Sequence, residues 1–190
     1  MAGAAPPTAV AAERAFAANA QTQGQWTAFR TFAADEAVMF TPEPVNAQTW
    51  LAGREDPPQA VMWWPARSFM SCDGTMAVNT GAWLRAGGTA AGYFTTVWSK
   101  RQDGSWKWLL DHGDGLAKPR PAGDRVRVRK ARCGAPRPGQ ASPGIRWSAD
   151  GSLSWAWQVA PDGTRRVTVS LWNGRRHEPV IDDLVRGQSR

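Results

Sequence analysis

The segment from Gly92 to Asp114, GYFTTVWSKRQDGSWKWLLDHGD, constrains the fold more than any other part of the chain. Two runs of aromatic and β-branched residues flank the dipeptide Asp103-Gly104, which readily adopts the positive-φ conformation of a tight reversal. The pattern is typical of a β-hairpin. With a three-residue loop at this turn, Asp111 is expected to lie opposite Thr95 on the neighbouring strand.

The residues before the hairpin predict helix first and strands afterwards. An Ala-rich, Gly-poor segment over 8–35 favours a helix that Gly24 interrupts, and a second short helix is expected near 49–51. Strands are expected at 37–40, 62–69, 76–84, 92–102 and 105–112. Helices followed by an antiparallel sheet indicate an α+β domain whose helices cover one face of the sheet.

The basic residues of the chain gather after residue 117. Residues 1–117 hold 8 Lys and Arg against 10 Asp and Glu, whereas residues 118–190 hold 15 against 6. We therefore predict three parts: a domain over 1–117, a basic linker rich in Pro, Gly and Arg over 118–144, and a small antiparallel β module over 145–190. Alternation of Arg and Val over 125–129 suits either linker or edge strand.

The positive run of this linker invites comparison with proteins that bind phosphate backbones. It comprises Arg120, Arg125, Arg127, Arg129, Lys130, Arg132 and Arg137. Such runs attract nucleic acid without sequence preference. This one lacks the interleaved aromatic residues of a single-strand platform, so we do not expect nucleic acid as a partner.

Cysteine content and hydropathy bound the compartment. Cys72 and Cys133 are the two cysteines, and neither lies in a C-x-x-C pair or beside a histidine, so no metal site is expected. They could form one disulfide in an exported protein or remain buried thiols. No segment approaches the 18 to 20 apolar residues, roughly, that span a bilayer. The apolar start, MAGAAPPTAV, is no intact signal peptide but could remain after processing, which leaves a periplasmic or exported location and a cytoplasmic one open.

Three stretches of the sequence resemble the nuclear transport factor 2-like superfamily, which includes ketosteroid isomerases and SnoaL-like cyclases. These are DEAVMFTP at 35–42, SCDGTMAV at 71–78, and the hairpin with its DGSWKW turn. The resemblance covers about residues 8–117 and is strongest to uncharacterised bacterial members. It implies a cone-shaped, curved antiparallel sheet around N-terminal helices, an apolar pocket open at one end, and usually a homodimer. The β module from 145 would be an extension to this fold.

The resemblance also implies one or two polar groups inside the pocket. A carboxylate held among aromatic rings loses solvation, so its pKa rises toward a range useful for proton transfer. Asp111 is the first candidate, and the two-residue period of a strand places Tyr93 on the same face as a hydrogen-bond donor. His112 would lie on the opposite face, where it could shuttle protons at the pocket mouth. Alternatively, Asp111 ends a strand, Tyr93 packs and His112 bonds to nearby backbone.

Aromatic side chains are the candidates for the pocket wall. Trp63 and Trp64, with Arg67 nearby, would suit a flat or anionic ligand. The further ligand-binding candidates are Phe40, Trp83, Trp98 and Trp108. Equally, these rings could simply fill a large core.

Two classes of function follow. In the first, the chain is a pocket protein for a small apolar or aromatic molecule, acting as an isomerase, dehydratase or lyase through a buried carboxylate. In the second, it is a non-catalytic ligand-binding module or a dimeric interaction scaffold. No cofactor is expected, because the sequence has no Gly-rich phosphate loop, no Ser-His-Asp spacing and no cluster of metal ligands.

Overall fold

The computed structural model describes residues 5–88, 90–121, 125–135 and 144–187. The chain forms two compact units, here called unit 1 (Met1–Ser68 with Val78–Arg127) and unit 2 (Phe69–Ala77 with Val128–Arg190). This division differs from the three predicted parts, because the segment Phe69–Ala77 groups with the C-terminal residues.

The helices of unit 1 are α1 (Ala9–Gln23), α2 (Gln25–Phe32) and α3 (Ala47–Leu51). Thr8 caps α1, since its hydroxyl accepts a hydrogen bond from the Ala11 amide at 3.1 Å. The predicted break at Gly24 is confirmed: this residue has φ 103°, and a Cβ there would lie 2.2 Å from the Asp56 carboxyl carbon. Only glycine meets both requirements, so the chain turns from α1 into α2 here.

The five predicted strands form one large sheet together with a short strand, β2, that the sequence did not predict. They are β1 (Ala33–Phe40), β2 (Pro44–Asn46), β3 (Met62–Met70), β4 (Met76–Leu84), β5 (Ala91–Lys100) and β6 (Trp106–Leu116). The order is β2-β1-β6-β5-β4-β3-β7. The β5–β6 hairpin is antiparallel as expected, whereas β1 joins β6 in parallel, so the sheet is mixed. The α+β class predicted from the sequence is confirmed.

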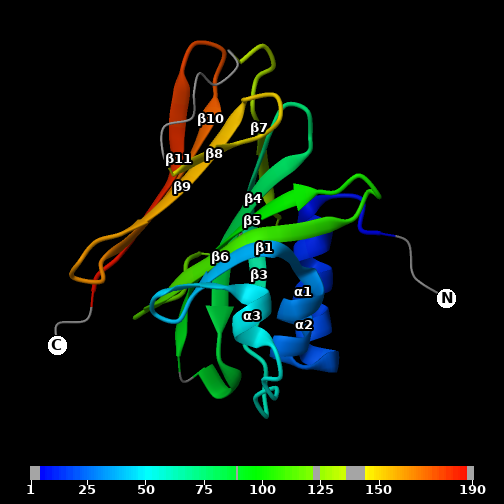
Figure 1. The fold of residues 1–190 in the computed structure, drawn as a ribbon, viewed down its shortest axis with the longest axis vertical. Coiled ribbons are helices and arrows are strands. Elements are labelled where there is room, and N and C mark those ends of the chain that lie inside the picture. Colours follow the sequence, from blue (N-terminus) through cyan, green and yellow to red (C-terminus); the bar gives the residue numbers. More distant parts are fainter. Residues whose placement is uncertain (1–4, 89, 122–124, 136–143, 188–190) are drawn as a thin grey trace. The chain divides into compact units, whose positions relative to one another are not determined.

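The helices lie together on one face of this sheet (Figure 1). The buried residues of α1 recur at helical spacing, as Ala9, Ala12, Phe16 and Ala20. The Phe16 ring contacts the indoles of Trp63 and Trp98, with ring centroids 4.7 and 6.1 Å apart. The core of unit 1 therefore lies between α1 and the central strands.

Unit 2 contains a four-stranded antiparallel sheet in the order β11-β10-β9-β8. Its strands are β8 (Ile145–Trp147), β9 (Leu153–Val159), β10 (Arg165–Trp172) and β11 (His177–Val185). Val167, Val169 and Leu171 are buried at alternate positions, as the sequence pattern predicted. The short strand β7 (Arg127–Lys130) is an outer strand of the larger sheet, and its four residues are exposed. Of the two alternatives for the Arg-Val alternation, linker or edge strand, the structure therefore shows an edge strand.

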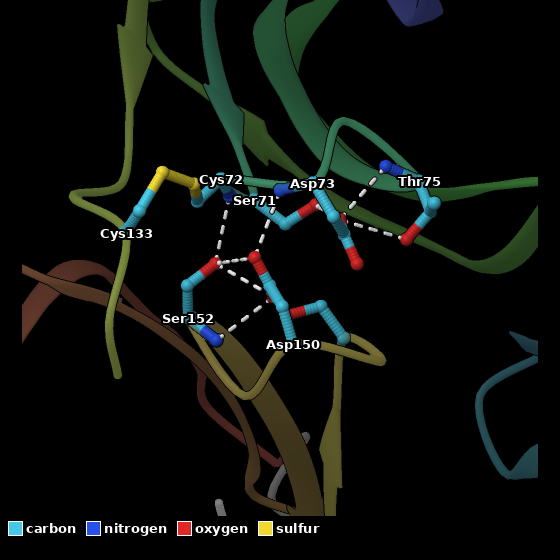
Figure 2. Close-up of a disulfide and its surroundings, with 8 residues drawn as sticks. Ser71, Cys72, Asp73, Thr75, Cys133, Asp150 and Ser152 are labelled. Atoms are coloured by element: carbon cyan, nitrogen blue, oxygen red, sulfur yellow. Dashed lines mark hydrogen bonds between the residues drawn. A yellow bond between two sulfur atoms is a disulfide. The ribbon is translucent and has the colours of Figure 1, made fainter. Parts of the chain in front are cut away.

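Cys72 and Cys133 form a disulfide within unit 2, which resolves the alternative that the sequence left open (Figure 2). Beside it, two turns share the pattern Ser-x-Asp-Gly-Ser/Thr, at 71–75 and 148–152. In each turn the aspartate accepts from the serine hydroxyl two residues earlier, at 2.5 and 2.6 Å, and from the amide two residues later, at 3.0 Å in both. Identical sequence patterns thus build identical turns.

The two turns are also bonded to each other. The Cys72 amide donates to the Ser152 hydroxyl at 2.7 Å, and the Asp73 amide donates to the second carboxylate oxygen of Asp150 at 2.8 Å (Figure 2). Because Cys133 follows β7, the disulfide joins the 69–77 segment covalently to the later part of unit 2. This explains physically why that hairpin tip groups with unit 2.

Candidate functional site

Unit 1 contains a cavity of about 180 Å³ beneath the helices. Its apolar lining consists of Phe29, Val61, Trp63, Trp83 and Phe94. Its polar lining consists of Gln25, Arg85, Tyr93, Asp111 and His112, and Gly113 completes the wall. A mostly apolar cleft with a few polar groups is the usual form of a small-molecule site.

A β-bulge on β6 decides which way Asp111 points. The hairpin begins in the expected register, with Trp98 opposite Trp108, but the next pair is Val97 with Leu110. Leu109 is therefore an extra residue without a partner. The expectation that Asp111 lies opposite Thr95 is wrong, because this insertion shifts the register by one and places Asp111 opposite Thr96.

The bulge also moves the residues after Leu109 to the face of the sheet opposite the one predicted. A one-residue shift exchanges the two sides of a strand, so Trp108 and Asp111 now lie on the same face. Trp108 contacts Phe29 of α2 at 6.0 Å between ring centroids, which identifies this as the face toward the helices. Asp111 thus borders the cavity, and it does not share its face with Tyr93 as the uninterrupted alternation predicted.

Asp111 occupies an environment that disfavours its charge. Its carboxylate accepts one hydrogen bond, from the Thr96 hydroxyl at 2.8 Å, and the side chain is otherwise enclosed by the pocket wall. Burial raises the pKa of Asp111 to about 7, and the Thr96 hydrogen bond opposes the shift. The residue retains partial exposure because the cavity itself reaches it. Asp111 can therefore hold or release a proton near neutral pH.

A second acid, Glu13 of α1, lies fully buried behind the pocket wall. Its carboxylate accepts hydrogen bonds from Trp98 Nε1 at 2.7 Å, Trp63 Nε1 at 2.9 Å and Asn79 Nδ2 at 3.2 Å. Burial raises the pKa of Glu13 to about 8 against the effect of these donors, and the Asp111 charge adds to the increase. Glu13 thereby fixes the indole of Trp63, which lines the cavity.

Sequence reasoning missed Glu13, although a signal was present. Ala9, Ala12, Phe16 and Ala20 form the buried stripe of α1, and Glu13 occupies the i+4 position of that stripe. A lone carboxylate on the apolar side of an amphipathic helix must find donors across the helix–sheet contact. Here the donors are two indoles and an amide from three different strands.

The side chains of Tyr93 and His112 contact each other, whereas the predicted partner of Tyr93 was Asp111. The Tyr93 hydroxyl lies 3.5 Å from His112 Nε2, and the two ring centroids are 5.6 Å apart. Because of the same bulge, His112 lies opposite Thr95 and shares its face with Tyr93. The guanidinium carbon of Arg120 lies 3.7 Å from the Tyr93 ring centroid, and this Arg donates to the Thr80 hydroxyl at 2.8 Å.

The other predicted residues are divided between pocket and core. Trp63 and Trp83 line the cavity. Trp98 and Trp108 are fully buried in the core, and Phe40 contacts the His112 ring at 6.1 Å between centroids. Trp64 is half-buried, Arg67 is exposed, and neither lines the cavity.

The acidic pair at the start of β1 also lies outside the site. Asp35 and Glu36 are exposed, and Glu36 forms an ion pair with Arg101 at 2.8 Å. In the described part of the chain, no group of three or more His, Cys, Asp or Glu residues could hold a metal ion. Over the same residues, no helix is long and apolar enough to cross a bilayer.

Two cations of the basic run, Arg120 and Arg129, have individual side-chain partners. Arg120 stacks on Tyr93 as above, and Arg129 pairs with Glu178 at 2.6 Å. The side chain of Arg132 lies close to Gly174, 3.1 Å from the position of a Cβ there. Arg137 lies outside the described residues.

No protein-family model matches this chain, and no curated protein does. Solved structures do resemble it. A protein assigned as a ketosteroid isomerase from Parabacteroides distasonis is 14% identical, with a TM-score of 0.46 over 58% of this chain and 89% of that one. A nuclear transport factor 2-like protein of unknown function from Shewanella oneidensis is 19% identical, with a TM-score of 0.43 over 53% and 91%.

A third similar structure comes from Salmonella enterica serovar Typhimurium. This nuclear transport factor 2-like superfamily protein is 14% identical, with a TM-score of 0.43 over 61% of this chain and 93% of that one. The likenesses concern the fold. N-terminal helices on one face of a mixed sheet, with a hairpin near its centre, give unit 1 an α+β fold.

Proposed function

We propose that unit 1 binds a small apolar or aromatic molecule in its cavity and that Asp111 exchanges a proton with that molecule. The observation that carries the proposal is the Leu109 bulge, which directs a single carboxylate toward a mostly apolar cavity beneath the helices. Bulges recur next to active sites because they re-aim a side chain. A pKa near 7 suits a general acid or base at neutral pH.

The volume of the cavity limits the size of the molecules that can bind. A dry cavity of about 150 Å³ accommodates benzene, so 180 Å³ accommodates one ring with a short substituent. Isomerase, dehydratase and lyase reactions of such molecules share one step, the removal of a proton from carbon next to a carbonyl group. In that step Asp111 takes the proton and the carbonyl oxygen gains negative charge, which a protonated or hydroxyl donor must stabilise.

Exchange of carbon-bound hydrogen tests this step directly. The protein is incubated in deuterated water with single-ring ketones, and deuterium at the carbon beside the carbonyl is followed by NMR. We expect exchange with the native protein and at least a hundredfold slower exchange with Asp111→Asn, because the amide cannot accept the proton. Asp114→Asn is the matched control, since Asp114 lies on the same strand but does not line the cavity.

A cavity that binds a ligand without catalysis predicts a different result. If the cavity only holds a ligand, the ketones bind the native protein and Asp111→Asn equally and no deuterium enters. That result would remove Asp111 as a base and leave a binding module. Failure of every single-ring compound to bind would refute the pocket proposal itself.

We also propose an oxidising compartment for this protein and retain the homodimer as a prediction. The Cys72–Cys133 disulfide supports export, because cytosolic thiols are kept reduced. Thiol alkylation of protein from its native cells, followed by mass measurement, tests this: free thiols would contradict it. Light scattering after size exclusion measures the oligomeric state, and a monomeric mass would contradict the dimer.

A further inference from the structure

Arg85 is a cation on the wall of the cavity, and the proposed proton transfer does not use it. It directly follows β4, two residues after Trp83, and its side chain is exposed. Arg67 was predicted from the sequence to bind an anionic ligand. It does not line the cavity. Arg85 therefore occupies the role predicted for Arg67.

The backbone around Arg85 fixes where its side chain begins. The Arg85 amide donates to the Ala90 carbonyl at 2.9 Å, and the Gly88 amide donates to the Arg85 carbonyl at 3.0 Å. Gly87 and Gly88 have φ values of 75° and 66°, which permit this tight connection between β4 and β5. The Arg85 side chain thus starts from a hydrogen-bonded turn that directly follows β4.

Arg85 has no acidic partner among the residues that the structure describes. Ion pairs found there include those of Arg101 with Glu36, Arg129 with Glu178 and Arg166 with Asp182. The cavity does contain one carboxyl group, but Asp111 accepts its hydrogen bond from Thr96. A guanidinium without a carboxylate, on the rim of an apolar cavity, is a typical means of recognising an anionic ligand group.

We propose that the cavity selects a single-ring organic carboxylate, with its ring in the apolar interior and its carboxylate paired with Arg85. This inference rests on the proposed function, because it names the ligand class of the same site. The volume of 180 Å³ admits one ring. Trp63, Trp83 and Phe29 provide aromatic faces for it. Asp111 would repel a second carboxylate, which orients the ligand's charge toward Arg85.

Matched ligands and matched variants test the selection. Binding of benzoate, phenylacetate and cinnamate is compared with that of their neutral counterparts benzamide, phenylacetamide and cinnamamide by calorimetry and tryptophan fluorescence. The native protein should bind the anions about three- to tenfold more tightly than the amides, as one partly exposed charged hydrogen bond allows. Added salt should reduce this preference.

Arg85→Gln should abolish the preference, because it weakens binding of the anions more than binding of the amides. Arg67→Gln is the control, since this exposed arginine lies on β3 of the same sheet but outside the cavity wall, and it should bind every ligand as the native protein does. Equal affinity for anions and amides, or an Arg85→Gln preference equal to the native one, would refute the carboxylate inference and leave the pocket proposal standing. No binding of either series by the native protein would refute both.

Discussion

Replacing Glu13 by Gln should flatten a fall in stability that the native protein shows between about pH 4.5 and pH 8. The pKa of Glu13 lies at about 8 in the folded protein, against an ordinary value of 4.5, chiefly because the side chain is buried. Between these values the folded state binds a proton that the unfolded chain has released. Stability is therefore greatest below the ordinary pKa and decreases as pH rises through the folded one.

The size of the effect follows from the shift. Each pKa unit corresponds to about 1.4 kcal/mol, so the difference between these two pKa values sets an upper bound of about 5 kcal/mol for the loss of stability across this range. Gln does not titrate. Its side-chain NH2 group would face one of the indole or amide donors that now donate to the Glu13 carboxylate, and a donor cannot accept that hydrogen bond. That mismatch should cost about 1–3 kcal/mol at every pH. The variant should thus be less stable at pH 4.5, and the difference should shrink or reverse by pH 8.

Urea unfolding, followed by tryptophan fluorescence at intervals from about pH 4.5 to pH 8.5, measures both curves. Asp111 contributes in the same direction in both proteins, so the difference between them reports Glu13 together with its coupling to the Asp111 charge. Glu36→Gln is the control. Burial acts to raise the pKa of Glu36, but the hydrogen bond from Arg101, a backbone hydrogen bond and the Arg101 charge together outweigh burial. The pKa of Glu36 is therefore lowered, so the slope in this window should stay native. An unchanged slope in Glu13→Gln would refute the reasoning.

Two further perturbations test the scaffold. Replacing both Cys72 and Cys133 by Ser should cost about 4 kcal/mol, because the disulfide closes a loop of 61 residues, and a native melting temperature in the variant would contradict this. Gly92→Ala should destabilise unit 1 by about 2–4 kcal/mol, because the new Cβ would lie 2.0 Å from the Asp114 carbonyl oxygen and 2.4 Å from the Trp83 ring. Gly115→Ala on the same hairpin has 4.0 Å of room and should be nearly neutral, so equal losses in the two variants would argue against the steric explanation.

Local signals in the sequence predicted most elements of the fold. The Asp103-Gly104 turn, the break at Gly24 and the strand Met76–Leu84 follow from residue preferences that act over a few positions. The bulge at Leu109 does not, because it depends on how β5 and β6 pair over their whole length. The extra residue Leu109 moved Asp111 and His112 to the faces opposite those predicted.

The candidate site was accordingly only half predicted. Asp111, Trp63 and Trp83 line the cavity, yet the partners of Asp111 could not be predicted without the register of β5 and β6. Glu13 and its three donors are far apart in sequence, with separations of 50 to 85 residues, so no local pattern unites them. Arg85 entered the site because its strand ends beside the cavity, which requires the tertiary fold.

The titration of the Asp111 carboxyl group tests the central claim most directly. Carbon-13 NMR of aspartate-labelled protein, with the resonance assigned by its loss in Asp111→Asn, gives the midpoint. We expect a midpoint near 7, since burial at the cavity wall outweighs the Thr96 hydrogen bond. A midpoint near the ordinary value of 3.8 would show a solvated carboxylate and contradict the account of an acid–base group held in an apolar pocket.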